Sequence, residues 1–335
     1  MVKILAIGDP HFKISNVQDT NLMSNAILTI ANDIQPDLIV VLGDILDRHE
    51  TIHVTPLCHA VQFLYSLSKI TKTYVLIGNH DLKNNKEFLS SEHCLYPLKF
   101  CDNKNMVVVD TTTMLQLQNM MFIFVPYVPI GKFQEALNKI PEWKSATCIF
   151  AHQEFKGAKM GSIISQEGDD WPVEYPLVIS GHIHEFQQVQ KNIIYIGTPI
   201  QHSYGDSCTK TVSLFKFNLT LESHERIKLH GVPCKKIIKI HCNEVSSFTP
   251  EPDSNLKIII HGTSGEIKNI VKHPNVLQWK KHGHKVIYKE VSTSNISTCL
   301  NKPRKYSEVF YNSISNNKDL IDLFNKLFGK TSDKK

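Results

Sequence analysis

The sequence predicts an α/β protein in which two stacked β-sheets lie between outer layers of helices (α/β/β/α), followed by a small α/β unit and a C-terminal helical tail. Two observations predict this fold class. The first 220 residues alternate short apolar, β-branched runs with amphipathic segments, a pattern typical of strands covered on both faces. The charge then changes sign: residues 1–220 hold 17 Lys+Arg and 21 Asp+Glu (net −4), whereas residues 221–335 hold 20 and 11 (net +9).

Short apolar runs predict the strands of the core. These runs are Lys3–Gly8, Leu38–Leu42, Thr73–Ile77, Met106–Val109, Met121–Val125, Thr147–Phe150, Leu177–Ser180, Ile193–Ile196 and Thr211–Phe217. Because the later runs have shorter connections, we expect those strands to form antiparallel hairpins. Helices are predicted over Asn21–Asp33 and Pro56–Lys69. The stripes expected to face the core are Leu22, Ala26, Ile30 and Ile34 in the first helix, and Val61, Leu64, Tyr65 and Ser68 in the second.

The part after the core divides into three segments. Residues 1–231 form the predicted core, and residues 232–291 form a small unit with strands at Lys236–His241, Leu256–His261 and Lys285–Val291. Ser264 caps a helix that runs to about His273, where Pro274 interrupts it. Residues 292–303 are polar and rich in Ser and Thr, as in linkers. Residues 304–335 return to helical spacing, with stripes over Tyr306–Ile314 and Leu320–Phe328.

The composition excludes several classes of protein. No apolar stretch reaches the length of a membrane span, and the apolar start ends at Asp9, too early for a signal peptide. The eight cysteines are scattered and include no C-x-x-C pair. A chain of this length does not need disulfides, so we expect reduced thiols and a cytoplasmic or nuclear location.

Five short motifs carry oxygen and imidazole ligands, and each follows an apolar run. They are Asp9-Pro10-His11, Gly43-Asp44-Ile45-Leu46-Asp47, Gly78-Asn79-His80-Asp81, Ala151-His152 and Gly181-His182-Ile183-His184. Ligands at the carboxyl ends of neighbouring strands converge on one edge of a sheet. Together these residues can hold two divalent metals, which favours phosphoester cleavage. The competing interpretation, that these are only turn-forming residues, explains one or two motifs but not all five.

The motifs and their order resemble the calcineurin-like metallophosphoesterase superfamily. The resemblance implies one metal held by Asp9, His11, Asp44 and His184, and a second held by Asp44, Asn79, His152 and His182, with Asp44 bridging. It also implies that His80 stabilises the transition state and protonates the leaving oxygen, while Asp47 orients and charges His80. Substrate contacts are expected from Arg48 and from His202, which lies just past the last motif. A mixed nitrogen and oxygen site suits Mn²⁺, our first expectation, as well as Fe or Zn²⁺.

Within the superfamily, the chain is most similar to the SbcD group of DNA double-strand-break repair nucleases, including phage and viral members. The similarity rests on the opening Ile4–His11, on Gly43–Arg48 and on Tyr195–Pro199 followed by Tyr204–Asp206, then on the small unit and tail. It implies a manganese-dependent exonuclease and endonuclease, a homodimer, and an SbcC-like coiled-coil ATPase partner that binds the tail helices. Lysines expected to contact DNA are Lys235, Lys236, Lys239, Lys280, Lys281 and Lys285.

Alternatives stay open at this point. The same ligands would serve a phosphatase or a small-molecule phosphodiesterase, and a non-catalytic DNA-end-binding subunit is a third possibility. The tail helices could equally pack on their own domain, and the basic segment could be an ordinary solvated surface.

Overall fold

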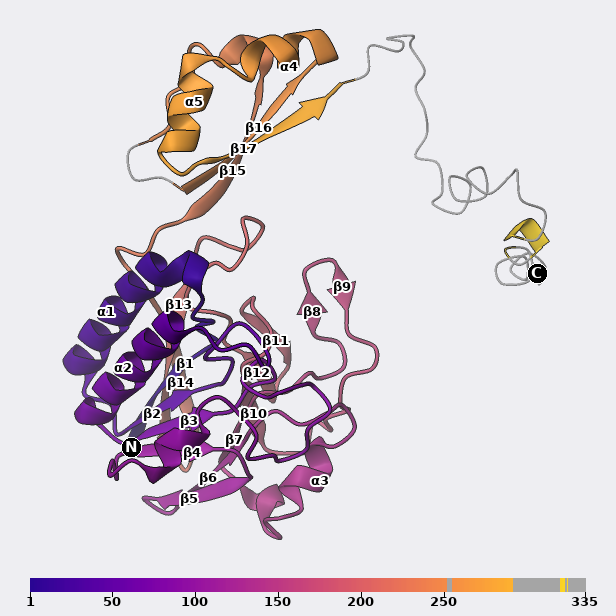
Figure 1. The fold of residues 1–335 in the computed structure, drawn as a ribbon. Helices are drawn as coiled ribbons and strands as arrows, with labels where there is room; N and C mark the ends of the chain where they lie inside the picture. Colours follow the sequence, from indigo (N-terminus) through magenta and orange to yellow (C-terminus); the bar gives the residue numbers. More distant parts are fainter. Residues whose placement is uncertain (252–254, 292–319, 323, 325–335) are drawn as a thin grey trace. The chain divides into compact units, whose positions relative to one another are not determined.

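The computed structural model describes residues 1–251, 255–291, 320–322 and 324 (Figure 1). The first sheet has six strands, in the order β14-β13-β1-β2-β3-β4. Their bounds are β14 (Thr220–Lys228), β13 (Thr211–Asn218), β1 (Val2–Ile7), β2 (Leu38–Val41), β3 (Thr73–Leu76) and β4 (Met106–Val109). Strands β1 to β4 are parallel, so their carboxyl ends share one edge of the sheet, while β13 runs antiparallel to β1.

The second sheet also has six strands, in the order β11-β12-β10-β7-β6-β5. Their bounds are β11 (Gln187–Gln190), β12 (Ile193–Tyr195), β10 (Leu177–Ser180), β7 (Cys148–Ala151), β6 (Met120–Val125) and β5 (Thr113–Leu117). The expectation of antiparallel hairpins is wrong for its four central strands, which are parallel. Crossovers make this possible: α3 (Phe133–Leu137) joins β6 to β7, and residues 152–176, with the small hairpin of β8 (Lys159–Met160) and β9 (Ile163–Ile164), join β7 to β10.

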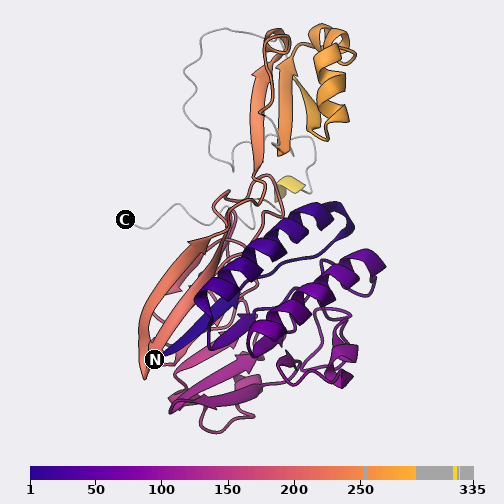
Figure 2. The same cartoon turned by 90° about the vertical axis from the view of Figure 1, so that its left-hand side faces the viewer.

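Helices α1 (Val17–Ile34) and α2 (Val54–Ile70) cover the outer face of the first sheet (Figures 1 and 2). Strand β1 shows why its sequence is continuously apolar. Leu5 and Ile7 pack in the cluster beneath the two helices, whereas Ile4 and Ala6 pack between the two sheets. Phe133 of α3 packs on the outer face of the second sheet. The α/β/β/α layering is therefore as predicted.

Both predicted helices exist, but the buried stripe is shifted in the first, and in the second only Leu64 and Ser68 of the predicted stripe are buried. In α1, Leu22 is 44% exposed, and the residues that face the core are Thr20, Met23, Ile27 and Ala31. In α2, Tyr65 is 48% exposed, and Ala60, Phe63, Leu64, Leu67 and Ser68 are among the buried residues. Both stripes satisfy a 3.6-residue period, so only the packing against the sheet decides which one is buried.

Residues 235–290 form a three-stranded sheet, in the order β15 (Lys235–His241), β16 (Asn255–Gly262) and β17 (Lys285–Glu290), with helices α4 (Ser264–Ile270) and α5 (Pro274–Lys281). They have a hydrophobic cluster of their own, which includes Ile258 and Trp279. Thr263, not Ser264, caps α4 by accepting a hydrogen bond from the Glu266 N–H. Pro274 does more than interrupt a helix, because it is the first residue of α5.

The remaining helical elements are short 3₁₀ turns. They are η1 (Ile14–Asn16), η2 (Tyr96–Phe100), η3 (Trp143–Ser145) and η4 (Cys242–Glu244). Residues 320–322 and 324 are helical. The rest of the predicted linker and tail, including the Tyr306–Ile314 stripe, lies outside the described residues.

Two further findings concern the expectations about thiols and membranes. Cys208 and Cys234 form a disulfide, so the expectation that the thiols are all reduced is corrected for this pair. The two cysteines are brought together because the loop after β12 meets the segment that leads into β15, where Lys235 N–H donates to Gln201 Oε1 (2.5 Å). Among the described helices, none is both long and apolar enough to cross a membrane.

Candidate metal centre

The five motifs meet at the carboxyl ends of parallel strands from both sheets. Asp9, Asp44 and Asn79 follow β1, β2 and β3, while His152 and His182 follow β7 and β10. Hydrogen bonds join segments that are remote in sequence: His182 N–H donates to Asp9 Oδ2 (2.7 Å), and His80 N–H donates to Asp44 Oδ1 (2.8 Å). The edges of the two sheets therefore form one site.

One group of ligand atoms comes from Asp44, Asn79, His152 and His182. Asn79 Oδ1 lies 3.0 Å from both His152 Nε2 and His182 Nδ1, and these two nitrogens are 3.3 Å apart. His152 Nε2 is also 3.4 Å from Asp44 Oδ2. Four donor atoms thus converge on one point.

A second group comes from Asp9, His11 and His184, whose ligand atoms also lie within 4.8 Å of one another. Asp44 Oδ2 is 3.5 Å from His11 Nε2 as well as 3.4 Å from His152 Nε2, so one carboxylate oxygen faces both groups. The arrangement places all seven predicted ligands as the sequence analysis grouped them, with Asp44 between the two sets.

These residues fit two divalent metals. Ligands bound at about 2.0–2.2 Å to one ion lie roughly 3.0–3.5 Å apart, which matches the separations in the Asn79 group. In the other group, Asp9 Oδ1 and both ring nitrogens of His11 are buried without a hydrogen-bond partner among the described residues. Unpaired buried polar atoms are costly unless something binds them, and a cation held by Asp9 Oδ1 and by His11 Nε2, the ring nitrogen nearer Asp44, would satisfy those two atoms.

The backbone around the ligands is locally unusual. His11, Asp44 and His182 adopt positive φ values of 44°, 48° and 76°, a region that L-residues rarely occupy. Gly43, at φ 102°, lies so close to His152 that a Cβ there would stand 2.6 Å from Nδ1. A strained backbone conformation persists only where the surrounding contacts enforce it, and such positions cluster at ligand-binding sites.

Hydrogen bonds behind the ligands set which ring nitrogen faces the site. His152 Nδ1 donates to the carbonyl oxygen of Leu42 (2.6 Å), which directs Nε2 toward Asp44 and Asn79. Glu154 Oε2 lies 3.7 Å from His182 Nε2, on the side of the ring opposite its ligand atom. Sequence reasoning missed Glu154, although its position two residues after the His152 motif was a signal that could have been used.

We expect Glu154→Gln to weaken metal binding at the Asn79 group by about 10- to 100-fold, because a carboxylate behind an imidazole raises its basicity as a ligand. Titration calorimetry with Mn²⁺ should show one weakened site and one unchanged site. Glu185→Gln is a matched control in the loop that leads into β11, since the Glu185 carboxylate contacts Lys210 and the Ser207 N–H rather than a ligand. Equal weakening by both variants would contradict the assignment.

Burial and neighbouring charges shift the pKa values of the candidate ligands in different directions. Burial lowers the pKa of His11 and of His184, so both are neutral imidazoles at neutral pH and can offer a lone pair to a metal. Burial also opposes the charge on His152, but Asp44 and Asp9 outweigh it and raise the pKa of His152 to about 9. For Asp44, burial is likewise outweighed, by His152 first and then by His11 and His80, so its pKa lies well below the ordinary value.

The protonated His152 predicts a pH-dependent metal affinity. At pH 7 a metal must displace the proton of His152, so the apparent affinity should rise by about tenfold per pH unit until about pH 9. Calorimetry in buffers with different ionisation enthalpies should detect at least one proton released per chain. His93→Gln, which changes a buried histidine away from the ligands, should leave the slope unchanged. A pH-independent affinity between pH 7 and 9 would contradict this prediction.

The predicted contact between Asp47 and His80 takes a different form. His80 Nδ1 donates to the backbone carbonyl oxygen of Asp47 (2.8 Å), whereas the Asp47 carboxylate binds Lys13 Nζ (2.8 Å) and lies 3.8 Å from His11 Nδ1. The contact that orients His80 is thus made by the Asp47 backbone carbonyl, whereas the carboxylate binds Lys13 and lies near His11.

Asp81 is a second residue whose position was overlooked. Its carboxylate accepts hydrogen bonds from Leu46 N–H (3.0 Å) and Gly78 N–H (2.9 Å), so it joins the second and third motifs. Burial, followed by the nearby Asp44, raises the pKa of Asp81 to about 6. Asp81 thus holds the two ligand loops in register, although it offers no atom to either metal group.

The two predicted substrate residues differ in burial and in their contacts. His202 Nε2 donates to the Asp9 carbonyl oxygen (3.2 Å), and its ring packs 4.5 Å from that of His11 and 4.9 Å from that of His184. Burial lowers the pKa of His202 to about 2, so its buried and unpaired Nδ1 is an acceptor. Arg48 is exposed and makes no hydrogen bond or ion pair within the described part of the chain.

Comparison with known proteins gives the following relationships. A model of the calcineurin-like phosphoesterase family matches residues 2–186, which include all five motifs. Protein 244L of Invertebrate iridescent virus 6, named as a phosphoesterase, is 42% identical over 279 residues, or 81% of this chain and 98% of the relative. Protein 078R of Invertebrate iridescent virus 3, also named as a phosphoesterase, is 36% identical over 326 residues, or 95% of this chain and 93% of the relative. The solved structure of Yfce, a phosphoesterase from E. coli, has a TM-score of 0.33 and 11% identity, covering 68% of this chain and 100% of that chain.

Proposed function

The chain belongs to the calcineurin-like phosphoesterase family, and from this premise we propose that it is a manganese-dependent DNA nuclease acting in DNA repair, recombination or replication. The observation that carries the proposal is the convergence of two ligand groups on Asp44, with the half-buried His80 beside them. The seven residues proposed as ligands lie close together in these two groups, which supports catalysis over a purely scaffolding role.

The chemistry of the reaction divides between the metals and the chain. When bound, two metals supply a nucleophile at neutral pH and offset negative charge on the phosphoryl oxygens. His11, His184, His152 and His182 would hold them with Asp9, Asp44 and Asn79. Neutral imidazole and amide ligands keep the site from becoming too anionic to accept a phosphodiester.

His80 is placed to act on the substrate. Its backbone N–H and its Nδ1 are both held, by Asp44 Oδ1 and by the Asp47 carbonyl, so the ring is fixed and Nε2 is the atom left for the scissile phosphate. We assign His80 stabilisation of the transition state and, in its imidazolium form, with Nδ1–H on the Asp47 carbonyl, transfer of the Nε2 proton to the leaving oxygen.

Five of the six lysines predicted to contact DNA are exposed, which supports DNA as the substrate. They are Lys236, Lys239, Lys280, Lys281 and Lys285. Exposed lysines bind the phosphate backbone without regard to sequence. Lys235 leaves the predicted set, because it is mostly buried and its Nζ contacts Asp19 (3.4 Å) and the Gln201 carbonyl oxygen.

We keep a homodimer and an SbcC-like ATPase as proposed partners on the resemblance of the motif segments, and the two viral relatives support a viral source.

Substrate comparison tests the function. The full chain with Mn²⁺ is incubated with supercoiled plasmid, linear duplex DNA and p-nitrophenyl phosphate, with and without a candidate ATPase partner. We expect cleavage of both DNA forms, and His80→Ala protein purified in the same way excludes a contaminating nuclease. Hydrolysis of p-nitrophenyl phosphate alone would instead establish a phosphatase and overturn the nuclease proposal.

The corrected position of Asp47 gives a further prediction. Asp47→Asn keeps the backbone carbonyl that holds His80 but removes the carboxylate behind His11. We expect the Mn²⁺ concentration for half-maximal hydrolysis to rise, while the rate at saturating Mn²⁺ stays within a few-fold of wild type. A loss at saturating Mn²⁺ as large as that of His80→Ala would show that the carboxylate acts on His80 after all.

A further inference from the structure

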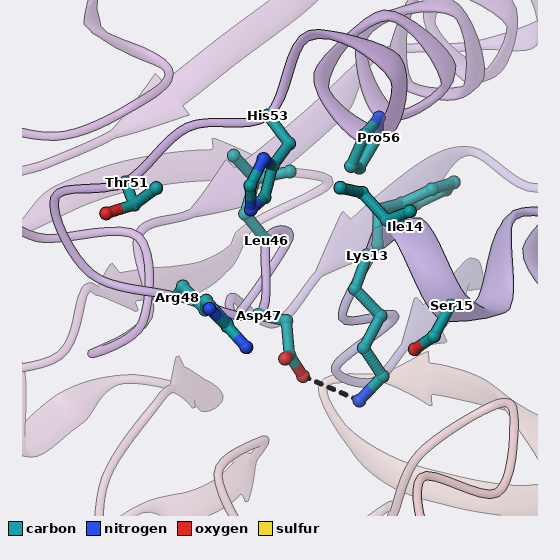
Figure 3. Close-up of a pocket in the computed structure, with 10 residues that line it drawn as sticks. Lys13, Ile14, Ser15, Leu46, Asp47, Arg48, Thr51, His53 and Pro56 are labelled. Carbon is teal, nitrogen blue, oxygen red and sulfur yellow. Dashed lines mark hydrogen bonds and ion pairs between the residues drawn. The ribbon is translucent and has the colours of Figure 1, made fainter.

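A pocket of about 190 Å³ lies between η1 and the start of α2 (Figure 3). Phe12 and Leu46, which are paired through an isolated β-bridge, line it and are almost completely buried. Ile14 and Pro56 add apolar surface, and the imidazole of His53 stands beside them. The pocket is smaller than the roughly 300–1,000 Å³ that encloses a whole drug-sized ligand, so it suits one part of a larger substrate.

The pocket shares a wall with the catalytic centre. Asp47 lines it, and the backbone carbonyl of the same residue holds His80 Nδ1. Lys13, another lining residue, lies two positions after the metal-group residue His11. A substrate group in the pocket would therefore lie beside the loop whose backbone holds His80.

The charges that line the pocket leave one cation uncompensated. Lys13 Nζ is paired with Asp47 Oδ1 at 2.8 Å, as the dashed line in Figure 3 shows. Arg48 is exposed on the other side of Asp47 in that view, and no hydrogen bond or ion pair joins it to another described residue. The complementary ligand has an apolar or stacking face for Ile14, Pro56 and His53, together with one negative charge for Arg48. A nucleotide within a phosphodiester chain has both.

We propose that this pocket binds the nucleotide adjacent to the scissile phosphate on the side that faces His80, with its phosphate on Arg48 and its sugar and base against the apolar wall. The inference rests on the proposed nuclease function and deepens it, because it assigns a subsite for the flanking nucleotide. An arginine fork suits a phosphate, and stacking on an imidazole tolerates any base, so the subsite would select nucleic acid without selecting sequence.

Thymidine trinucleotides test the charge of the subsite. Each carries one ordinary phosphodiester and one uncharged methylphosphonate, on either its 5′ or its 3′ side, and hydrolysis is followed with Mn²⁺ and the full chain. For the wild type we expect the methylphosphonate to lower kcat/KM by about tenfold on one of the two sides, because it removes a charge-assisted contact. In Arg48→Gln the same change should have no further effect, since the cation that it addresses is gone.

A pocket-filling variant tests the shape of the subsite independently. We compare kcat/KM for the unmodified trinucleotide with kcat/KM for bis(p-nitrophenyl) phosphate, which is too small to need the subsite. In Ile14→Trp we expect the ratio of the first to the second to fall by about tenfold, which corresponds to the loss of one stacking contact. Leu22→Trp is the matched control, because Leu22 is an exposed residue of α1 outside the pocket, and it should keep the wild-type ratio.

The outcomes separate the two proposals. Trinucleotide hydrolysis in which wild type and Arg48→Gln respond equally to the methylphosphonate overturns the subsite alone. An unchanged ratio in Ile14→Trp likewise overturns it. If Ile14→Trp does not fold, the exposed substitution Arg48→Gln still decides the question. Failure of the wild type to hydrolyse any trinucleotide, with the small ester still cleaved, overturns both the subsite and the nuclease function.

Discussion

Replacing Asp44 with asparagine is expected to remove both metals and to reduce phosphoester hydrolysis to the background rate. Asp44 Oδ2 lies within 3.5 Å of a histidine nitrogen from each ligand group, His11 Nε2 and His152 Nε2. Asparagine can keep the Oδ1 contact to the His80 N–H, but it puts a neutral amide where the bridging anion stood. Without that anion, two divalent cations at the roughly 3.5–4 Å spacing of two-metal sites would repel one another.

Metal content and activity should be measured on the same sample. Mass spectrometry after equilibration with Mn²⁺ gives the number of ions per chain, and bis(p-nitrophenyl) phosphate gives the rate. Asp110→Asn is the matched control, because Asp110 is another buried carboxylate, bound by Lys99 and His93 and by no ligand residue. It is expected to bind both metals. An Asp44→Asn protein with two metals at wild-type affinity would show that Asp44 does not bridge the centre.

His80→Ala is expected to keep both metals and to lose about 10²–10⁴-fold in kcat, the usual contribution of a positioned general acid or base. His80 belongs to neither ligand group, and its ring is anchored through Nδ1 to the Asp47 carbonyl. Its removal should therefore affect the chemical step rather than metal binding.

The neighbouring His49 provides a control within the same loop region. Its ring stacks on that of His80 with centroids 5.1 Å apart, and its Nδ1 is 3.0 Å from the Leu82 carbonyl oxygen. His49→Ala should cause a much smaller loss in kcat. If His80→Ala lost metal instead of rate, or kept full activity, the catalytic assignment of His80 would be wrong.

Much of the fold was predictable because strands that are covered on both faces are continuously apolar. The runs beginning at Lys3, Leu38 and Thr73 correspond to β1, β2 and β3 within a residue or two. Strand β14 was missed, since Thr220–Lys228 is polar and exposed along most of its length. The parallel pairing of β6, β7 and β10 was also missed, because strand direction depends on the path of the crossovers and leaves no local signature.

The sequence by itself determined which residues could serve the site: seven oxygen- and nitrogen-bearing candidate ligands, each placed after a strand, and His80 as a separate catalytic candidate. Strand ends are local properties, and parallel strands bring their carboxyl ends to one edge, so the convergence of these residues followed from the chain order, whereas their division into two metal groups came from the family resemblance. Only the tertiary structure decided which atoms meet. The choice of ring nitrogen in His152 depends on Leu42, 110 residues away, and the Asp47 carboxylate binds Lys13 while its backbone carbonyl holds His80. A hydrogen bond forms only within a narrow range of distance and angle. Between segments that are remote in the sequence, that geometry is set by packing rather than by spacing in the sequence.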